Sequence, residues 1–425
     1  MQTLEMSQRS TVGWVPSRVS ARRTHPPGPA EFIALTASMM ALFALSIDIV
    51  LPSLPQIAEQ MGVARANDQQ YVVSSVILGM SLGQVFYGPV SDSRGRKASI
   101  IVGLVIFGIG CVTSILATEI QEMLLGRFLQ GFGAAGPRIV TLALVRDQYQ
   151  GRDMARIMSI IVAALMLGPL LAPFVGQGLL MIGDWRVPFV ALFALDAAIL
   201  AWLVARQPET LPVDRRTRLS WRPFAAAAQE LCSSRAALGY TVVGGMMFGQ
   251  LFAYVSSAPQ IFKELYAVGA WFPLCFAVSA VSIAGAASAN ARLVTRLGMQ
   301  RLCLVAATGE AALSAFFLAV ACATSGQPPL WSTMLFLLAA FFCIGILFGN
   351  LNALALEPFG HVAGMAAGVV GSVMWFVAMA LATLVGQSFD GTVVPLAAGF
   401  TILSVASVVT LRWAGEGRGH LVGHS

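Results

Sequence analysis

Isolated ionisable side chains inside long apolar runs are the residues of this chain best suited to chemistry. Asp48 is the only charged residue in its run after Glu31, and Arg127 stands alone between Glu122 and Arg138. A carboxylate in hydrocarbon is costly and normally faces a cavity or a partner. A carboxyl group so placed can bind and release a proton. We therefore expect Asp48 to carry a proton and Arg127 to respond to its protonation state.

Both residues also have a structural interpretation. Asp48 would otherwise be an acid at the end of a helix, close to the lipid headgroups. Arg127 would otherwise donate hydrogen bonds to backbone carbonyls of a neighbouring helix, because a buried guanidinium must be paired or hydrated.

Three further ionisable residues lie inside apolar runs. Arg138 follows Arg127 by eleven residues, about three helical turns, so the two share one helix face. Arg138 would favour an anionic or zwitterionic substrate, or it would serve as a gating or snorkelling residue. Asp196 and Glu310 lie near the middle of two other runs. Each is a possible proton site, but we favour a protonated acid or one bonded to a neighbouring side chain.

The composition indicates a membrane protein. Of 425 residues, 57% are hydrophobic and only 11% are charged, whereas soluble domains carry about 25% charged residues. The net charge of +6 is concentrated in particular loops, whereas nucleic-acid binding usually needs a continuous basic face, so we expect no nucleic-acid partner. The six cysteines are scattered without a CxxC pair, which is typical of small core residues.

Twelve apolar runs have about the 20 residues that a membrane-spanning helix requires. This pattern predicts an all-α integral membrane protein with two sets of six helices. The runs fall at 31–54, 70–90, 98–118, 122–145, 157–181 and 187–205, and then at 237–258, 270–290, 301–323, 331–356, 362–387 and 392–413.

The predicted domains follow from these runs. A six-helix lobe over 30–205 and a second over 236–413 are joined by a cytoplasmic linker over 206–235. Residues 414–425 form a cytoplasmic tail. Residues 1–29 are basic and acid-poor, and we interpret them as a disordered cytoplasmic tail, the alternative being a targeting segment.

The loop charges predict the orientation in the membrane. Positive residues concentrate in alternate loops, which the positive-inside rule places in the cytoplasm. Both termini are then cytoplasmic, in a protein of the inner membrane. The basic residues of these loops include Arg94, Arg96, Lys97, Arg146, Arg152, Arg156, Arg215, Arg216, Arg218, Arg222, Arg235, Arg292, Arg296 and Arg301.

A charged turn-forming segment, Gly88–Lys97, separates the second and third runs. A second copy over Asn290–Arg301 occupies the same place in the second half and keeps Arg-x-Gly and a trailing base. Internal six-helix repeats are typical of secondary transporters, whose substrate site lies between the halves near the bilayer centre. A carboxylate such as Asp92 could cap the N-terminus of another helix, Gly95 permits a sharp turn, and Arg96 could pair with an acid or a phosphate.

Several motifs, in order, resemble those of the major facilitator superfamily. Gly88, Asp92, Gly95, Arg96 and Lys97 match its loop motif Gly-x3-Asp-Arg-x-Gly-Arg-Arg/Lys, with Ser93 in place of the first Arg. Leu124–Gly131 resembles the Arg motif of the fourth span, and Gly168–Gln177 resembles the antiporter motif of the fifth, with Ala172 and Gln177 replacing two glycines. With Ser46–Pro55 and Ala353–Gly364, the chain resembles the bicyclomycin and chloramphenicol resistance branch of drug/proton antiporters.

The resemblance implies which residues line a pathway and which control it. Spans one, four, seven and ten would line the cavity, which nominates Gln250, Tyr254, Asn350 and Asn352 beside Arg138. Spans six and nine would be peripheral, which argues against Asp196 and Glu310 as proton sites. Trp375 and Phe376 would face lipid or core. Small residues of the second and eleventh spans, such as Gly79, Gly83 and Ser372, would pack where the halves meet. The expected gating residues are Gly88, Asp92, Gly95, Arg96, Lys97, Gly168, Pro169, Pro173 and Gly176.

The function we expect is proton-coupled antiport that exports a small amphipathic compound by alternating access. The alternative is a proton-coupled importer on the same fold, and a receptor or enzyme is a more distant one. No Gly-x4-Gly-Lys-Ser/Thr motif occurs, so we expect no ATP site. We expect a monomer without cofactor or metal, driven by the proton gradient.

Overall fold

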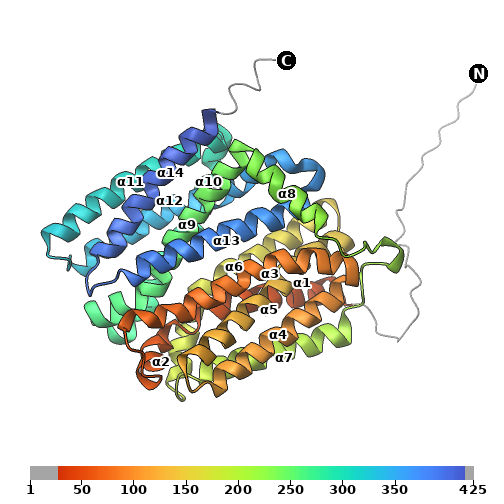
Figure 1. Cartoon of the computed structure of the whole chain (residues 1–425), viewed down its shortest axis with the longest axis horizontal. Coiled ribbons are helices and arrows are strands. Elements are labelled where there is room, and N and C mark those ends of the chain that lie inside the picture. Colours follow the sequence, from red (N-terminus) through yellow and green to blue (C-terminus); the bar gives the residue numbers. More distant parts are fainter. Residues whose placement is uncertain (1–26, 417–425) are drawn as a thin grey trace, which may run out of the picture.

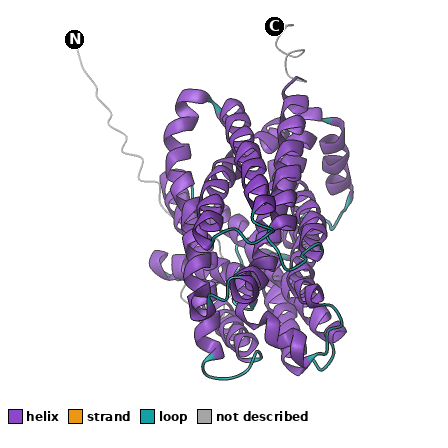
Figure 2. Cartoon of the chain, turned by 90° about the vertical axis from the view of Figure 1, so that its left-hand side faces the viewer, coloured by secondary structure: helices purple, strands orange, loops and turns teal. Residues whose placement is uncertain are grey.

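The structure is a computed structural model that describes residues 27–416, and in this part of the chain it consists of helices joined by loops (Figures 1 and 2). Most of the predicted tails 1–29 and 414–425 lies outside the described residues. Twelve helices of the described chain are long and apolar enough to cross a membrane. The predicted all-α architecture is therefore confirmed.

The membrane helices form two lobes of six, seen in Figure 1 as a red-to-yellow-green half and a green-to-blue half. The first lobe contains α1 (Pro29–Asp48), α3 (Tyr71–Arg94), α4 (Arg96–Leu116), α5 (Ile120–Gln148), α6 (Gly151–Leu180) and α7 (Val187–Arg206). The second contains α9 (Arg235–Pro259), α10 (Phe272–Leu297), α11 (Met299–Ala323), α12 (Leu330–Leu356), α13 (Ala363–Gln387) and α14 (Val394–Glu416).

Short elements connect these helices. They are the 3-10 turns η1 (Leu51–Ser53), η2 (Ala66–Gln70), η3 (Val213–Arg215), η5 (Gly269–Trp271) and η6 (Glu357–Val362), the π-helical turn η4 (Gln260–Leu265), and the helices α2 (Leu54–Gln60) and α8 (Arg222–Ser233). The lobes meet chiefly where α3 packs on α13 and α6 packs on α10. We call the end of the bundle that carries Gly95 the Gly95 end, and the opposite end, which carries Asn67, the Asn67 end.

Two predicted spans differ from the helices that form. The run 31–54 does not make one helix, because α1 ends at Asp48 and a 3-10 turn follows. Pro52 and Pro55 lack the N–H groups that a continuing helix would need. The run 157–181 lies in a helix that already begins at Gly151. Its first turns carry Arg152, Asp153 and Arg156, which a hydropathy criterion excludes although they are compatible with a helix that extends into water.

The two lobes repeat one turn geometry. Gly95 ends α3 and precedes α4 with φ 105° and ψ 158°, and Gly298 ends α10 and precedes α11 with φ 75° and ψ 156°. Positive φ favours glycine because a Cβ would clash with the backbone. The repeat expected from Gly88–Lys97 and Asn290–Arg301 is thus present in the backbone.

The small residues of α3 do not all serve the contact between the lobes. A Cβ on Gly79 or Gly83 would meet the backbone of Phe132 on α5, at 2.7 Å in each case. These glycines therefore allow α3 and α5 to approach each other within the first lobe. The contact of α3 with α13 is made instead by Ser81 and Ser372, each of which donates its hydroxyl to the other's carbonyl (3.0 and 2.7 Å).

Candidate functional site

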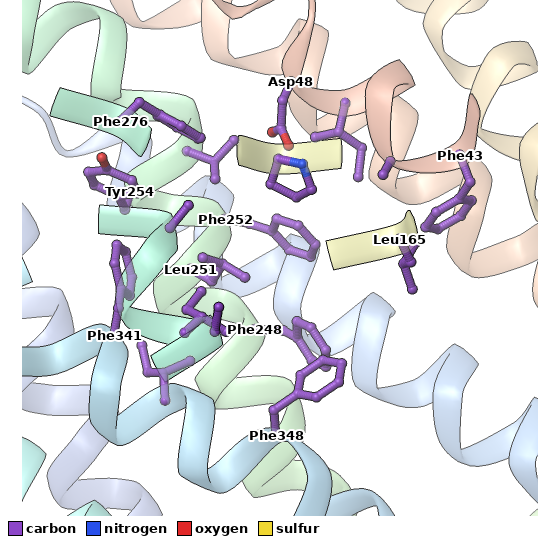
Figure 3. Close-up of a pocket in the computed structure, with 18 of the residues that line it drawn as sticks. Phe43, Asp48, Leu165, Phe248, Leu251, Phe252, Tyr254, Phe276, Phe341 and Phe348 are labelled. Carbon is purple, nitrogen blue, oxygen red and sulfur yellow. The ribbon is translucent and has the colours of Figure 1, made fainter. Parts of the chain in front are cut away.

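A central cavity of about 150 Å³ lies between the lobes. Residues of α1, α5, α6, α9, α10, α12 and α13 line it, so the four predicted spans contribute together with three others. Figure 3 shows Asp48 at one edge, with the phenyl rings of Phe248, Phe252 and Phe348 in the space below it. The cavity is an apolar chamber with few polar groups.

Asp48 is the last residue of α1, where the helix breaks, and its side chain lines the cavity. Only 4% of the residue is exposed. The ion pairs found among the described residues do not include one to Asp48. A buried carboxyl group without a paired cation is most stable when it carries a proton, which is the property that a proton site requires.

Arg127, on α5, is completely buried close to Asp48 but bonds to other groups. Its Nε donates to the carbonyl of Val72 (3.2 Å), and one terminal nitrogen donates to the carbonyl of Ser46 (2.9 Å) and to Gln130 Oε1 (2.7 Å). The other terminal nitrogen has no partner among the described residues. In this conformation Arg127 therefore has the structural role considered above, in which it donates hydrogen bonds to backbone carbonyls of neighbouring helices. Because Ser46 precedes Asp48 by two residues, Arg127 is tied to the end of α1.

Arg138 lies where the central cavity meets a second, wider pocket, and it lines both. Its guanidinium carbon lies 4.8 Å from the ring centre of Phe43 and 5.3 Å from that of Trp375. It also donates to Gln84 Oε1 at 2.9 Å. The two rings come from different lobes, so Arg138 joins the halves and separates the two spaces. This position suits a gate as well as a substrate contact.

Of the four polar residues of the second lobe that we expected to line the cavity, two line a pocket and two do not. Tyr254 lines the central cavity and donates its hydroxyl to Ser279 Oγ at 3.3 Å, and Asn352 lines the wider pocket. Gln250 and Asn350 line neither pocket. Asn350 bonds Asn290 Oδ1 at 2.6 Å and joins α12 to α10. The residues that line the cavity are 248, 251, 252, 254 and 255 on α9 and 341, 344 and 348 on α12, and Gln250 and Asn350 are not among them.

Aromatic side chains make up eight of the twenty residues that line the chamber, and apart from Tyr254 sequence reasoning missed them as lining residues. Trp375 is buried in the core, as expected, but it also lines the cavity, whereas Phe376 is 50% exposed and faces outward. The available signal was aromatic spacing on spans seven and ten. Phe248 and Phe252 lie one turn apart, and Phe341 and Phe348 lie two turns apart, which places each pair on one helix face. The aromatic lining is Phe43, Phe248, Phe252, Tyr254, Phe276, Phe341, Phe348 and Trp375.

The wider pocket, of about 500 Å³, extends from Arg138 towards the Gly95 end. Gly88, Asp92 and Arg96 line it from the first lobe, Phe224 from α8, and Gly368 and Gly371 from α13. A hydrophilic passage therefore separates the lobes on this side of the chamber.

Hydrogen bonds between the lobes close the Asn67 end. Asn67 Nδ2 donates to the carbonyls of Gln387 (3.1 Å) and Phe389 (2.7 Å), and Gln387 Nε2 donates to the Asn67 carbonyl (2.8 Å). Gln260 Nε2 donates to Asn67 Oδ1 at 3.0 Å and its own Oε1 accepts from Gln70. Among the described residues, the lobes are thus bonded together at the Asn67 end, and the wider pocket lies between them on the side of the Gly95 end.

The charged turn at the Gly95 end forms a network inside the first lobe. Arg96 pairs with Asp92 and, at 3.1 Å, with Asp147 on α5. Asp92 does not cap a helix, which corrects our expectation. The caps on α4 come from Glu209, whose carboxylate accepts from the backbone N–H groups of Arg96 (2.9 Å) and Lys97 (3.2 Å). Asp92 is unsuited because it lies in the last turn of α3, one turn before Arg96.

The antiporter-like segment of α6 supports the end of α1. A Cβ on Gly168 would meet Ala44, and one on Gly176 would meet the backbone of Ile49 and, at 3.3 Å, Pro52. Pro169 lines the cavity, and α6 continues through Pro169 and Pro173 without interruption. These small residues let α6 lie close to α1 on both sides of Asp48.

Asp196 and Glu310 are both buried and neither lines the central cavity. Asp196 Oδ1 and Glu310 Oε1 have no hydrogen-bond partner among the described residues. The argument that their spans are peripheral agrees with these positions. Of the two alternatives that we favoured for these acids, a bond to a neighbouring side chain is therefore not found at either of these oxygens among the described residues.

Two six-helix lobes around an aromatic chamber that opens at one end define a secondary transporter of the membrane. A sequence profile of the Major Facilitator Superfamily matches residues 36–383. The chain belongs to this superfamily and is a multi-pass protein of the inner membrane, and it is not an enzyme.

Relatives and solved structures agree with this assignment. The chain is 29% identical to a bicyclomycin resistance protein homolog of Haemophilus influenzae, over 86% of this chain and 91% of that protein. It is 25% identical to multidrug resistance protein D of Escherichia coli, over 90% and 95% of the two chains. A crystal structure of a D-xylose-proton symporter superposes with a TM-score of 0.74 at 17% identity, over 90% of this chain and 96% of that one. At that identity the likeness concerns the fold alone.

Proposed function

We propose that this protein is a proton-coupled antiporter that exports small amphipathic compounds from the cytoplasm. The observation that carries the proposal is that Asp48 is the one acid among the residues lining the described chamber between the lobes. Aromatic rings would hold the apolar part of a substrate, and Asp48 would exchange a proton for its polar or cationic part. The names of the relatives, which refer to bicyclomycin and multidrug resistance, support this substrate class.

The loop charges support the orientation of the proposal. The basic loops lie at the Gly95 end, which the positive-inside rule assigns to the cytoplasm. Both termini are then cytoplasmic, and the conformation described here faces inward. Substrate would enter through the wider pocket, pass Arg138 and displace the proton of Asp48.

Arg127 would couple the protonation of Asp48 to the conformational change. Its bond to the Ser46 carbonyl ties α5 to the last turn of α1, directly before the break at Ile49 and Val50. When Asp48 loses its proton, the guanidinium nitrogen that has no partner here offers a positive charge nearby. A movement of the end of α1 would follow, and it would be transmitted to α6 through the close contacts at Gly168 and Gly176.

Proteoliposomes with an imposed pH gradient test the proposal against a panel of amphipathic compounds. We expect wild-type protein to move a compound against the direction of proton flow. Asp48→Asn should lose gradient-driven transport. Glu310→Gln is the matched control, because it neutralises a buried acid that lies away from the chamber.

Two outcomes would contradict this mechanism. Gradient-driven transport that survives Asp48→Asn unchanged would exclude Asp48 as the proton site. Accumulation in the direction of proton flow would indicate the importer alternative.

A further inference from the structure

A second groove, of about 340 Å³, lies between α4 and α7 on the outer side of the first lobe. Figure 1 places these two helices at the margin of the molecule, away from the second lobe. The walls are aliphatic and aromatic, and several of them are widely exposed: Ile109 by 53%, Val105 by 44% and Phe193 by 40%. In helices that cross a membrane, such side chains face the lipid tails. The groove therefore opens to the hydrocarbon.

One carboxyl group lies in this apolar groove. Asp196 lines it although the residue is only 2% exposed, and its Oδ1 has no hydrogen-bond partner among the described residues. Gly108 faces it from α4, and a Cβ there would lie 3.0 Å from Asp196 Oδ2. The absence of a side chain at Gly108 keeps the space beside the carboxyl group open.

The depth of Asp196 decides which ligands can reach it. It is the tenth of the 20 residues of α7. At a rise of about 1.5 Å per residue, it lies about 14 Å from either end of the helix. Lipid headgroup amines stay at the surface of a hydrocarbon core that is about 30 Å thick, so they do not reach it. A ligand of Asp196 must therefore dissolve in hydrocarbon and carry the positive charge that neutralises an unpaired carboxylate.

We propose that the groove between α4 and α7 is a binding site for hydrophobic cations that enter from the lipid, with Asp196 as the counter-ion. An ionised carboxylate is costly at this depth, and a hydrophobic cation beside it forms a neutral pair. Apolar walls from both helices would cover the remainder of the ligand. The site is separate from the central chamber, and it does not depend on the proposed antiport.

The groove is also placed to affect the chamber. Cys111, buried on α4, is within electrostatic reach of both Asp196 and Arg127. Asp196, Cys111 and Arg127 are the ionisable groups of α7, α4 and α5 in this region. A cation bound at Asp196 would therefore alter the field at Arg127.

Binding of radiolabelled tetraphenylphosphonium to the full-length protein in lipid nanodiscs tests this site. We expect saturable binding that persists in Asp48→Asn and becomes about tenfold weaker or more in Asp196→Asn, which corresponds to about 1.4 kcal/mol. Binding should weaken as the pH falls, because protons compete for Asp196. Tetraphenylborate, of the same shape but opposite charge, should show no saturable binding that depends on Asp196.

A second variant separates loss of binding from loss of folding. Ala197→Phe fills the groove from an exposed position of α7 and keeps the carboxyl group, so it should reduce binding as Asp196→Asn does. Glu310→Gln should leave the affinity unchanged. Equal tetraphenylphosphonium affinity in wild type, Asp196→Asn and Ala197→Phe would overturn the proposal. Tetraphenylborate binding that Ala197→Phe weakens as much as it weakens tetraphenylphosphonium binding would also overturn the proposal. The groove would then recognise the shape of a ligand and not its charge.

Discussion

At the scale of single residues, position relative to the chamber decides the role of a side chain more than its chemical type does. Trp375 and Phe376 are sequence neighbours of similar character, yet Trp375 lines the chamber and stacks near Arg138 while Phe376 faces outward. Phe248 and Phe252 lie one turn apart on α9 and both line the chamber, whereas Gln250 between them does not. The helical periodicity of each wall therefore selects the residues that a substrate meets.

This neighbouring pair provides a matched test of the chamber. Trp375→Ala removes an aromatic wall and one of the two rings around Arg138, and aromatic contacts contribute about 0.5–1.5 kcal/mol beyond their buried area. We expect the affinity for a transported compound to fall about tenfold or more. Phe376→Ala, on the lipid side, should change it by less than about twofold. Equilibrium binding by fluorescence quenching measures both, and similar losses in the two variants would contradict the assignment of the chamber.

Arg127 offers a test that separates structure from coupling. Arg127→Lys keeps the charge but cannot reproduce the bonds to Val72, Ser46 and Gln130, so we expect a loss of stability of about 1.5–3 kcal/mol. Arg127→Gln removes the charge as well. If Arg127 senses Asp48, this variant should move half-maximal transport to a higher pH, since a nearby cation favours an ionised carboxylate.

The two measurements for Arg127 are a thermal unfolding midpoint and a pH profile of transport in proteoliposomes. A purely structural arginine would lower the midpoint in both variants and leave both pH profiles as in the wild type. That result would refute the coupling role and leave the proton role of Asp48 intact.

At the scale of elements, the sequence predicted twelve spans because hydropathy over about 20 residues is a strong signal. It did not predict α8, whose buried Ala227 and Leu231 lie one turn apart in an alanine-rich segment. That amphipathic pattern was readable, but the segment was treated as a linker. The break of α1 after Asp48 was also signalled, by Pro52 and Pro55 inside an apolar run. In the prediction of this span, the hydropathy of the run outweighed the two helix-breaking prolines.

The candidate site was less predictable than the fold for a physical reason. Asp48 and Arg138 could be nominated because an ionisable group in an apolar span is unusual, and Tyr254 could be nominated from the family resemblance. The aromatic lining could not, because a phenylalanine in a membrane helix is equally compatible with lipid, core and cavity. The cap that Glu209 provides on α4 joins residues that are 113 positions apart in the chain. No local sequence pattern predicts such a contact.

The repeated turns at Gly95 and Gly298 lead to a prediction about these elements. Alanine at either position places a side chain in a backbone region that costs about 1–3 kcal/mol outside glycine. At Gly95 the new Cβ would also meet the Glu209 carboxylate, whereas at Gly298 the space is open. We expect Gly95→Ala to lower the unfolding midpoint more than Gly298→Ala does, measured by thermal unfolding in nanodiscs. Equal losses would show that the Glu209 cap contributes little.

At the scale of the whole molecule, the contacts that join the two lobes at the Asn67 end are hydrogen bonds. The Asn67 end is held by amide side chains and backbone carbonyls from both lobes, and the ion pair described at this end, Arg186 with Asp184, lies within the first lobe. The Gly95 end carries ion pairs, but they lie within the first lobe. Neutral hydrogen bonds contribute about 0.5–1.5 kcal/mol each. A few of them can be exchanged for others without a large barrier, as alternating access requires.

Locking the Asn67 end should therefore stop transport without unfolding the protein. Asn67→Cys with Gln387→Cys, in a background whose six native cysteines are replaced, can be joined by a short bifunctional thiol reagent. If the end must open during each cycle, the joined protein should lose nearly all gradient-driven transport and regain it when the link is cleaved by a reductant. Gln60→Cys with Trp185→Cys replaces a pair that is bonded at 2.7 Å within the first lobe, and the same reagent should leave that variant active. Transport that continues in the joined Asn67–Gln387 variant would mean that the lobes exchange access without separating at this end.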